Sequence, residues 1–498
     1  MSMKNLNRKE IGLPGALYRP LAEADVEKIV RASFDVLERS GFRVYSPAAF
    51  EAFRAAGAVT NTETRIVRLP RELVEDALAS NPSSITLFSR DGKNDCVLER
   101  NRVHYGTGGT AIYVLDPDTG QRRPSTTEDV VLNARMVEAL DNIHLFTINV
   151  FPHDIPVKDD IDVNRFFHSF DHTRKHVMGG VYSMAGLRAV IEMAEMIAGG
   201  APALRERPFV SFITLIISPF KIDRDYGEMT CLLAQRSLPV VVPTEPICGT
   251  TSPITLAGNI LTHVAETLGG VTLVQCVRKG APAICGSVGS IADLRTLGHL
   301  GGPIERAMIN SAVAQVMQRL EVPLYSTGGT TDAKSLDVQC AFESAMSSLL
   351  VAMSGANYIH DIAGLMEFDL TVAYDKLVVD NEILGMVQRV LRGIEVNDDT
   401  LAADLMIAKG PGQDYLGEDH TIRYMRKEFF FPQIADRDKR ESCAPGNDAL
   451  ARARRVVADL RSARSENCLS PDLRERILRK FPSIKRMTGE GEPPRNIP

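Results

Sequence analysis

The sequence predicts a (β/α)8 barrel, the TIM-barrel class of α/β fold, with an N-terminal α/β subdomain and a C-terminal helical extension. Short apolar runs recur between residues 143 and 362 at intervals of roughly 30–40 residues, the spacing of successive strand–helix units. Stretches with helical periodicity fill the intervals, which makes neighbouring strands parallel. A barrel of about 250 residues fits inside this chain of 498 residues with additions at both ends. A doubly wound open sheet is the alternative.

The first part of the chain, residues 1–140, is expected to form the N-terminal subdomain. Helices are predicted over Ala22–Gly41, Ala48–Ala56 and Arg71–Leu78, and short strands over Ile85–Phe88 and Val103–Tyr105. A glycine-rich loop, Gly106–Thr110, follows, and a further helix begins near Thr126. The loop lacks the G-K-[ST] ending of a phosphate-binding loop, so nucleotide binding is disfavoured.

Residues 141–400 are expected to form the barrel. Seven strands are predicted over Ile143–Val150, His176–Val181, Phe209–Ile217, Pro239–Pro243, Pro282–Cys285, Pro323–Tyr325 and Tyr358–Ile362. Helices are predicted over Met184–Ala198, Arg224–Gln235, Leu256–Lys279, Pro303–Leu320 and Val338–Met353. An eighth strand, which closure of the barrel requires, is expected at either end of this series.

Residues 401–498 are expected to form the C-terminal helical extension. The segment Gly410–Tyr415 breaks the preceding pattern, and the basic and aromatic stretch His420–Arg437 either packs on the barrel or meets a partner. A charge-rich helical tail spans Asp448–Lys485, and the last residues, from Gly489 onward, are predicted to be disordered.

Composition and charge disfavour several functions. A net charge of −6 argues against nucleic-acid binding, which requires a basic surface. The N-terminus lacks an apolar signal-peptide core and no segment approaches about 18 uninterrupted apolar residues, so we expect a cytoplasmic protein without membrane contact. The eight cysteines are scattered without zinc-site spacing, and no metal site is expected. The chain has no tryptophan, so a cationic ligand would have to meet Tyr and Phe rings.

The most informative segment is Pro323–Glu343, where a short apolar strand breaks into a glycine turn and then a polar helix. Gly328 and Gly329 permit positive φ or close approach to a ligand. Active sites of (β/α)8 barrels lie at the C-terminal ends of the strands, so the polar side chains after this turn are candidates. They are Asp332, Lys334, Asp337, Gln339 and Glu343. The alternative is an ordinary strand–helix turn in which Asp332 caps the next helix.

Polar residues also end two other predicted strands. Glu245 follows the strand at Pro239–Pro243, and His360 and Asp361 lie in the strand that begins at Tyr358. Parallel strands end at the same edge of a barrel, so we expect these side chains to share one site. Their chemistry is that of carboxylates and an imidazole, without a metal triad.

Long motifs occur in order along the chain. They include GTGGTAIYVLDPDTGQRRPSTTED from Gly106, GGTTDAKSLDVQCAFE from Gly328, GANYIHDIAGLMEFDL from Gly355 and GPGQDYLGEDHT from Gly410. Together they resemble the trimethylamine methyltransferase family, and the resemblance covers nearly the whole chain. It implies a (β/α)8 barrel that moves a methyl group from a methylated amine to the cobalt of a corrinoid, which a separate small protein holds. Archaeal trimethylamine enzymes of the family carry pyrrolysine, whereas this chain resembles the branch without it, which includes glycine betaine methyltransferase.

The resemblance also implies roles for residues. Pyrrolysine would stand within or beside Pro323–Glu343, with Gln339 as the first choice of position. The candidate catalytic residues are Gln339, Lys334, Asp332 and Glu343, and the candidate substrate-binding residues are Glu245, Tyr325, Gly328, Gly329, His360, Asp361 and Arg306. Glu245 or Asp361 would face an ammonium group. A betaine carboxylate would accept from Arg306, from His360 or from the amides of the two glycines. Structural roles, as helix caps or core residues, are the alternatives.

A quaternary nitrogen already carries the charge that lets it leave as a neutral amine, so a barrel without pyrrolysine suits quaternary amines. The chain itself is expected to bind no cofactor, because the corrinoid arrives on its partner protein. The other expected partner is a further copy of the chain, in a homo-oligomer. Two alternatives stay open: a barrel lyase or aldolase with a Schiff base at Lys334, or a non-catalytic betaine-binding protein.

Overall fold

The computed structural model describes residues 11–296, 298–442, 446–463 and 467–487. Eight parallel strands form its centre: β7 (Arg102–Tyr105), β10 (Phe146–Thr147), β11 (Val177–Gly180), β12 (Val210–Ile213), β14 (Val240–Thr244), β16 (Ala283–Ser287), β19 (Leu324–Thr327) and β20 (Tyr358–His360). β20 pairs in parallel with β7, and a bridge between Gly106 and Leu145 joins β7 to β10. The sheet is therefore closed into a ring, and the predicted (β/α)8 barrel is confirmed against the open sheet.

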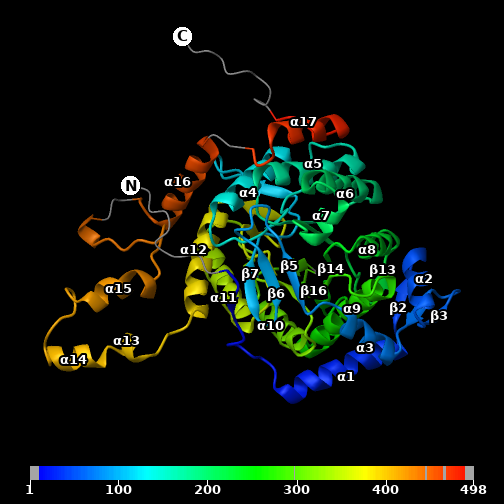
Figure 1. Cartoon of the computed structure of the whole chain (residues 1–498), viewed down its shortest axis with the longest axis horizontal. Helices are drawn as coiled ribbons and strands as arrows, with labels where there is room; N and C mark the ends of the chain where they lie inside the picture. Colours follow the sequence, from blue (N-terminus) through cyan, green and yellow to red (C-terminus); the bar gives the residue numbers. More distant parts are fainter. Residues whose placement is uncertain (1–10, 297, 443–445, 464–466, 488–498) are drawn as a thin grey trace, which may run out of the picture.

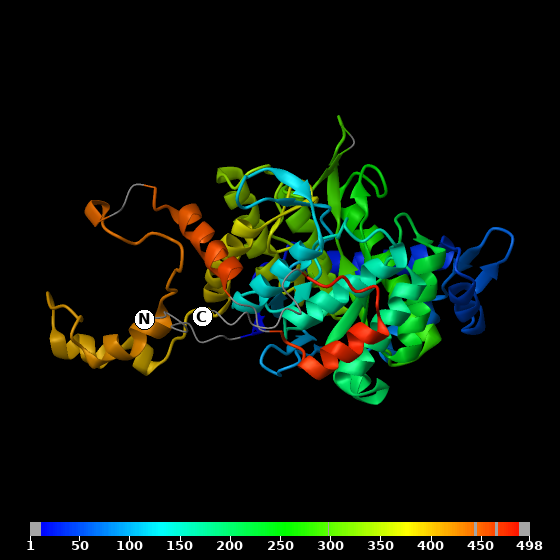
Figure 2. The same ribbon diagram turned by 90° about the horizontal axis from the view of Figure 1, so that it is seen from above.

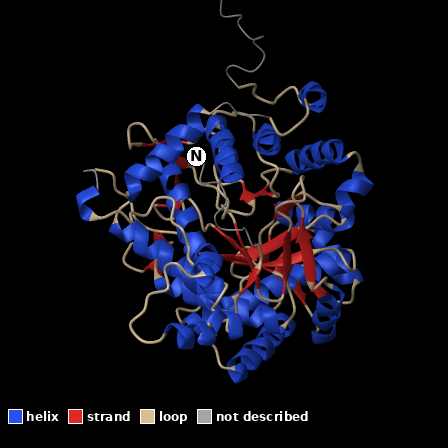
Figure 3. Cartoon of the chain, turned by 60° about the vertical axis from the view of Figure 1, so that its left-hand side comes forward, coloured by secondary structure: helices blue, strands red, loops and turns tan. Residues whose placement is uncertain are grey.

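Helices follow each barrel strand and lie outside the sheet, as Figure 3 shows. They are α4 (Thr127–Ala139), α5 (Lys158–His172), α6 (Met184–Ala198), α8 (Arg224–Arg236), α9 (Leu256–Val277), α10 (Ile304–Arg319), α11 (Val338–Ser354) and α12 (Tyr374–Leu391). A short helix, α7 (Ala201–Glu206), follows α6. Each of the seven predicted strand segments overlaps one barrel strand, although β14, β16 and β19 extend one or two residues further.

The eighth strand, β7, lies at the N-terminal end of the series. It falls inside residues 1–140, which the sequence assigned to a separate subdomain, and α4 of the same segment is the first barrel helix. The division of the chain at residues 140 and 400 stays a prediction, but the barrel begins at Arg102. The sequence did not separate β7 from the N-terminal elements because β7 is short and closely follows other short strands. Its apolar pattern does not differ from theirs.

The N-terminal end of the barrel is closed by a hairpin of β5 (Ser84–Leu87) and β6 (Cys96–Glu99). Its apolar side chains join the barrel interior in one buried cluster, which contains Ile85, Leu87, Cys96, Leu98, Leu145, Met178, Val241, Ile284, Tyr325 and Tyr358. A packed interior of this kind is typical of these barrels. Because the hairpin plugs this end, a substrate has to arrive at the opposite, C-terminal ends of the strands.

The remaining N-terminal elements cover one side of the barrel (Figure 1). They are α1 (Glu23–Arg39), β2 (Phe42–Val44), α2 (Pro47–Ala55), β3 (Val59–Asn61), β4 (Ile66–Arg68) and α3 (Arg71–Ser80), with β13 (Lys221–Ile222) completing their small sheet. The short strand β1 (Leu13–Pro14) pairs instead with β7 and contacts α12. α1, α2 and α3 pack on α9. α9 is the one described helix long and apolar enough to cross a membrane, but 83% of its apolar window is buried inside the protein, as in a core helix.

Small sheets built from the loops stand over the C-terminal ends of the barrel strands. One contains β8 (Tyr113–Leu115), β9 (Arg122–Pro124), β21 (Leu365–Met366) and β22 (Thr371–Ala373), and another contains β15 (Ile247–Cys248), β17 (Ser290–Asp293) and β18 (Gly298–Leu300). The strands of both belong to loops that follow barrel strands. They hold those loops in fixed positions above the barrel.

The C-terminal extension divides into two parts. α13 (Asp398–Leu401), α14 (Ala403–Lys409) and α15 (Asp419–Glu428) project away from the barrel in both views (Figures 1 and 2), whereas α16 (Ala449–Ser462) packs on α12 and α17 (Pro471–Lys480) packs on α6. A 3-10 turn spans Arg440–Ser442. The predicted disordered end from residue 489 lies outside the described residues.

Candidate functional site

A network of charged side chains lies at the C-terminal ends of the barrel strands. We call it the charged network; its members are Glu245, His299, Arg306, His360, Asp361 and Asp369. They come from the loop after β14, from β18, from α10, and from the end of β20 with its following loop. Positions far apart in the chain meet because parallel strands end at one edge.

Arg306 is the centre of the charged network. Its Nη1 donates to Asp369 Oδ2 at 2.7 Å and to Thr330 Oγ1 at 2.9 Å. Its Nη2 lies 3.9 Å from Asp361 Oδ2. Only 3% of the side chain is exposed, so the guanidinium is held between two carboxylates away from water.

His299 extends the network from Asp369 to Glu245. Its Nε2 lies 3.2 Å from Asp369 Oδ2, and its Nδ1 lies 3.4 Å from Glu245 Oε1. The side chain of Glu245 is 43% exposed. Glu245 is thus the member of the network that is most open to solvent.

His360 forms the other end of the network. Its Nε2 lies 3.0 Å from Asp361 Oδ2, and its Nδ1 lies 2.6 Å from the Ser326 carbonyl oxygen. The imidazole stacks on Tyr325, with ring centroids 3.8 Å apart. This stack brings together Tyr325 of β19 and His360 of β20, two of the candidate substrate-binding residues.

Four buried polar atoms of the network have no hydrogen-bond partner within the described protein: Arg306 Nε and Nη2, Asp361 Oδ1 and Asp369 Oδ1. An unsatisfied buried polar atom costs about 1–3 kcal/mol, and more when it is charged. Such atoms are rare in native proteins and call for water or a ligand. The network therefore offers both free donors and free carboxylate oxygens to a bound molecule.

The charges of the network set the pKa values of its members. Burial alone would raise the pKa of Asp369, but Arg306 and His299 outweigh it and hold that pKa below its usual range. Burial alone would lower the pKa of Arg306, but Asp369, Asp361 and Glu245 outweigh it and raise it. Desolvation by the surrounding protein raises the pKa of Glu245, even though part of its side chain is exposed. Arg306 and Asp369 are therefore a stable charged pair, whereas Glu245 holds its proton more readily.

The backbone of the site is strained at its carboxylates. Asp361 has φ +61°, and Glu367, Phe368 and Asp369 form a run with φ between +51° and +64°. Left-handed backbone costs a residue with a side chain roughly 1–2 kcal/mol. Strain of this kind clusters at functional sites, because the surrounding structure has to enforce it. Here Glu367 fixes the run by accepting from Thr371 Oγ1 at 2.6 Å.

The glycine-rich loop after β7 leaves room for Asp361. A Cβ on Gly108 would lie 2.3 Å from Asp361 Oδ1 and 2.5 Å from its backbone nitrogen. Any side chain at this position would displace the carboxylate. The loop therefore has a steric role in the site, and no phosphate is needed to explain its glycines.

The predicted catalytic segment forms hydrogen bonds that hold the loop beside the charged network. Asp332 Oδ1 accepts from the Gly301 amide at 2.7 Å, and desolvation by burial raises the pKa of Asp332. Glu343 Oε2 accepts from Thr331 Oγ1 at 2.5 Å and from the Asp332 amide at 2.9 Å. Gln339 Nε2 donates to Glu343 Oε1 at 3.0 Å. These residues form a chain that holds the loop after β19, one step away from the charged network.

Two sequence expectations for this segment need correction. Asp332 does not cap the next helix; Asp337 does, since its side chain accepts from the Cys340 amide at 3.1 Å. The amides of Gly328 and Gly329 already donate, to the His360 carbonyl at 3.4 Å and to Ser347 Oγ at 3.0 Å. They have no proton left for a substrate carboxylate, because a backbone amide has only one.

Lys334 is exposed, and its contacts are with residues beside the charged network. Its Nζ donates to the Asp332 carbonyl at 2.7 Å and stands 4.2 Å from the centre of the Phe368 ring. Lys376 is the lysine that α12 buries beside this loop, and it is paired with Asp380 at 2.7 Å while donating to the Gly329 carbonyl. Among the described residues, no group of three or more His, Cys, Asp and Glu side chains is placed to hold a metal ion.

Sequence reasoning missed His299 and Asp369. His299 lies on β18, in a long insertion between a barrel strand and its helix, and Asp369 follows a run that reads as an ordinary loop. The loops after β16 and β20 contain more charged residues than the strands before them, which are apolar. This contrast could have pointed to His299 and Asp369. The glycines of Gly106–Thr110 were a second signal, because they lie opposite Asp361.

A buried glutamate anchors the strand end that carries Glu245. Glu266 of α9 accepts from Ser218 Oγ and the Phe220 amide, each at 2.6 Å, and from Thr244 Oγ1. Desolvation by burial, opposed by these hydrogen bonds, raises the pKa of Glu266 to about 7. Its hydrogen bonds hold Thr244 in place and so help to orient Glu245, the next residue along the chain.

Comparisons with known proteins show which sequences and which solved structure this chain is similar to. The family model described as trimethylamine methyltransferase (MTTB) matches residues 2–489. A trimethylamine methyltransferase MttB of Desulfitobacterium hafniense is 34% identical over 93% of this chain and 92% of its own length. A glycine betaine methyltransferase of the same species is 30% identical over 86% of this chain and 88% of its own. The crystal structure of the Methanosarcina barkeri monomethylamine methyltransferase covers 88% of this chain and 94% of its own, at 15% identity and a TM-score of 0.48.

Proposed function

The chain belongs to the trimethylamine methyltransferase family and is a methyltransferase that takes a methyl group from a methylated amine; we propose that the amine is quaternary, such as glycine betaine, and that the acceptor is Co(I) of a separate corrinoid protein. The glycine betaine methyltransferase among its relatives supports this choice of amine. The chain also has no pyrrolysine, since all its residues are common ones.

One observation carries the choice of substrate: the charged network has both free acceptors and free donors. Its three carboxylates outnumber its single guanidinium, which suits a cationic nitrogen. The unpartnered Arg306 Nε and Nη2 suit a carboxylate. A betaine carries both groups in one small molecule and so matches both sets of atoms.

The residues bind and orient the substrate, and the acceptor supplies the nucleophile. Asp361 or Glu245 faces the quaternary nitrogen, while Arg306 takes the carboxylate. The Tyr325 ring, stacked on His360, offers the aromatic face that the absence of tryptophan leaves to tyrosine. Burial raises the pKa of the Tyr325 phenol well above 10, so the ring stays neutral.

The substrate loses its positive charge when the methyl group leaves. A site that held the cation too strongly would stabilise the ground state more than the transition state. The pairing of Asp369 with Arg306 and His299 limits the charge that reaches the ammonium group. Most of the rate gain then comes from positioning the methyl group in a site with little water.

The experiment is a methyl-transfer assay with a panel of amines. The purified chain is mixed with a reduced corrinoid protein, and the conversion of Co(I) to methyl-Co(III) is followed by absorbance. We expect turnover with quaternary amines, and more with betaines than with quaternary amines that lack a carboxylate. Turnover with trimethylamine alone would contradict the quaternary assignment, and no turnover with any amine would contradict methyl transfer.

The two alternative functions lack support from the site. A Schiff-base lysine has to lose its proton easily, which burial or a neighbouring cation achieves. Lys334 is exposed instead and lies over an aromatic ring. A pure binding protein would show a ligand-induced rise in melting temperature without methyl transfer.

The remaining partners follow from the same proposal. The described cysteines are all free thiols, which fits a reducing cytoplasm. The corrinoid protein has to approach the C-terminal ends of the barrel strands, because the opposite end is plugged. We also propose that the chain forms a homo-oligomer.

A further inference from the structure

We propose that the segment from Ile394 to Phe429, which we call the arm, is a dimerisation arm that covers the outer side of α11 and α12 of a second copy of this chain. The inference concerns a surface remote from the charged network, is independent of the proposed activity and specifies the interface of the proposed homo-oligomer. It rests on where the exposed apolar side chains of the molecule gather.

The arm exposes an unusual number of large apolar side chains. Of the 23 exposed large apolar residues among the described part of the chain, ten belong to the arm. They are Ile394, Val396, Leu401, Met406, Ile407, Tyr415, Leu416, Ile422, Met425 and Phe429, with exposed fractions between 38% and 83%. α13, α14 and α15 contain no buried residue. Helices this short are marginal without tertiary packing, so they need a surface to pack on.

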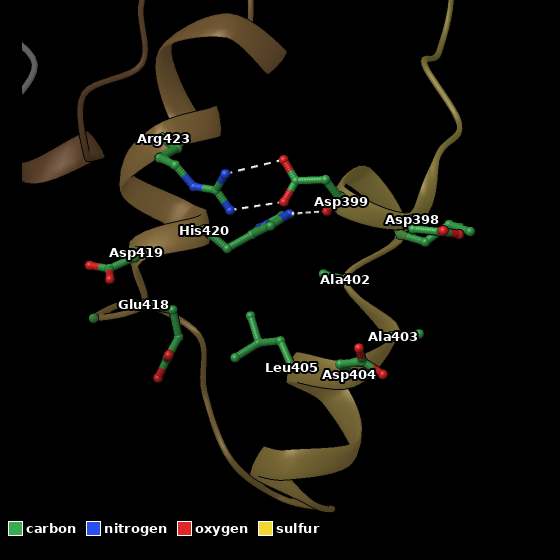
Figure 4. A pocket seen from close by; sticks show the side chains of 12 residues that line it. Asp398, Asp399, Ala402, Ala403, Asp404, Leu405, Glu418, Asp419, His420 and Arg423 are labelled. Atoms are coloured by element: carbon green, nitrogen blue, oxygen red, sulfur yellow. Dashed lines mark hydrogen bonds and ion pairs between the residues drawn. The ribbon is translucent and has the colours of Figure 1, made fainter.

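The arm is attached to α12 at its end, and polar contacts join its own helices to one another. Arg389 of α12 donates to the Glu428 carbonyl at 2.7 Å, and Phe430 packs against Gly385. Within the arm, Arg423 and His420 of α15 reach across to Asp399, as Figure 4 shows. The helices thus hold their arrangement through polar contacts, and their apolar side chains stay available.

A cleft of about 900 Å³ lies between α13, α14 and α15. It is lined by Asp398, Asp399, Leu401, Ala402, Ala403, Asp404, Leu405, Gly417, Glu418, Asp419, His420 and Arg423. In Figure 4 the Leu405 side chain points into the space between the two sides. Most of its lining is charged or polar, so the cleft gives the arm a concave shape, while the apolar contacts of the arm come from its other exposed side chains.

The outer side of α11 and α12 also exposes apolar side chains, like those of the arm. Val338, Phe342 and Met346 are exposed at every fourth position of α11, and Met386 and Val390 do the same on the neighbouring α12. We call these five residues the α11–α12 face. The arm does not cover this face in its own chain, because both sets of side chains remain exposed.

A second copy satisfies both surfaces at once. In a two-fold dimer each arm would cover the α11–α12 face of the other copy, so two identical contacts form. The fifteen side chains offer on the order of 500–1,000 Å² of apolar surface per copy. A stable interface buries about 800 Å² per partner, so the area is sufficient.

The position of the arm argues against the corrinoid protein as its occupant. Each barrel helix runs from the C-terminal to the N-terminal ends of the strands, so α12 ends at the plugged end of the barrel. The arm starts there, on the opposite side from the charged network. A partner that delivers a methyl acceptor to the network has to bind elsewhere.

The test measures the mass of the full chain by analytical ultracentrifugation over a range of concentrations. We expect twice the 54.6 kDa of the single chain. The paired substitution Ile407→Asp with Leu416→Asp alters the arm, and Phe342→Asp alters the α11–α12 face. Each should raise the dimer dissociation constant by about 100-fold or more, because apolar contacts become buried charges. The matched control is Val59→Asp, at a residue that is 60% exposed on β3, and it should leave the constant unchanged.

Mixing the two variants gives the decisive result. A dimer of one arm variant with one face variant contains one contact in which both surfaces are native, so it should form more tightly than either variant alone. A mixture that gains nothing would overturn the proposal, and so would a wild-type chain that stays monomeric. An arm variant that keeps its dimer but loses methyl transfer to the corrinoid protein would also overturn it.

Discussion

Asp369 and Arg306 form a 2.7 Å ion pair in which the carboxylate belongs to a residue with left-handed backbone. The pair joins the loop after β20 to α10, and both side chains are largely buried. Arg306 and His299 hold the Asp369 carboxylate and so help to keep this residue in its left-handed conformation. This relationship gives the first prediction.

Substitution of Asp369→Asn should destabilise the protein and lower activity. The buried Arg306 loses a charged partner, which costs about 3 kcal/mol when a pair is broken on one side. We expect a lower melting temperature and at least a tenfold loss of kcat/KM. The control is Asp293→Asn, which removes the exposed pair with Arg295 and should change neither quantity. Unchanged kcat/KM in the Asp369 variant would show that the charged network does not serve the reaction.

The Arg306→Lys variant should distinguish binding of the substrate carboxylate from binding of its ammonium group. Lysine keeps the charge but not the planar group that can bind a carboxylate while pairing with Asp369. We expect kcat/KM to fall more for glycine betaine than for tetramethylammonium, which has no carboxylate. The ratio of the two values is the measurement, since a general loss of structure would lower both equally. Equal losses would remove Arg306 from carboxylate binding.

The Gly108→Ala variant should move Asp361. The added Cβ would lie 2.3 Å from Asp361 Oδ1, far inside van der Waals contact, so the carboxylate has to shift. We expect a loss of kcat/KM of about tenfold or more, with a smaller change in melting temperature. Gly417→Ala is the matched control, because a Cβ there would meet no atom within 4 Å. Full activity in the Gly108 variant would contradict a role for Asp361 at the reacting centre.

Glu266 should make the stability of the protein depend on pH. Its pKa is raised from 4.5 to about 7 in the folded state, so the folded protein holds this proton over a range where the unfolded chain has lost it. The resulting stabilisation is complete below pH 4.5 and is lost as the pH rises through about 7. Between pH 5.5 and pH 8 this one group should lower the unfolding free energy by about 2 kcal/mol.

The Glu266→Gln variant provides the comparison. Its amide does not titrate, and it can still accept from the Phe220 amide while donating to the hydroxyls of Ser218 and Thr244. The measurement is the unfolding free energy of both proteins at the two pH values. The wild type should lose about 2 kcal/mol more than the variant, and parallel pH profiles would contradict a raised pKa for Glu266.

Much of the fold could be predicted because it depends on local pattern. The seven apolar runs each became a barrel strand, and the helices between them follow from their periodicity. The part played by β7 in the barrel could not be seen in the sequence, because it depends on pairing between β7 and β20, about 250 residues apart. The arm was also missed as a unit, since short helices with exposed apolar residues look like ordinary surface helices in sequence.

The candidate site was predicted in part. Glu245, His360, Asp361, Tyr325 and Arg306 were named from strand ends or from family resemblance, and the structure brings them together. Gln339 and Glu343 came from the same segment but face the supporting loop. Their order along a helix could not show which side faces the network, because that depends on how α11 packs.

The sequence by itself determined the strand–helix rhythm, the family and the edge of the barrel that carries the candidate site. These depend on side-chain type and spacing, which each segment carries alone. Only the tertiary structure decided which charges meet. It placed His299 and Asp369 between Glu245 and Arg306. It used the amides of Gly328 and Gly329 in hydrogen bonds within the protein, and it left Arg306 Nη2 without a hydrogen-bond partner. Electrostatic contacts act over a few ångströms in space, so they depend on the positions that closure of the barrel gives to distant loops.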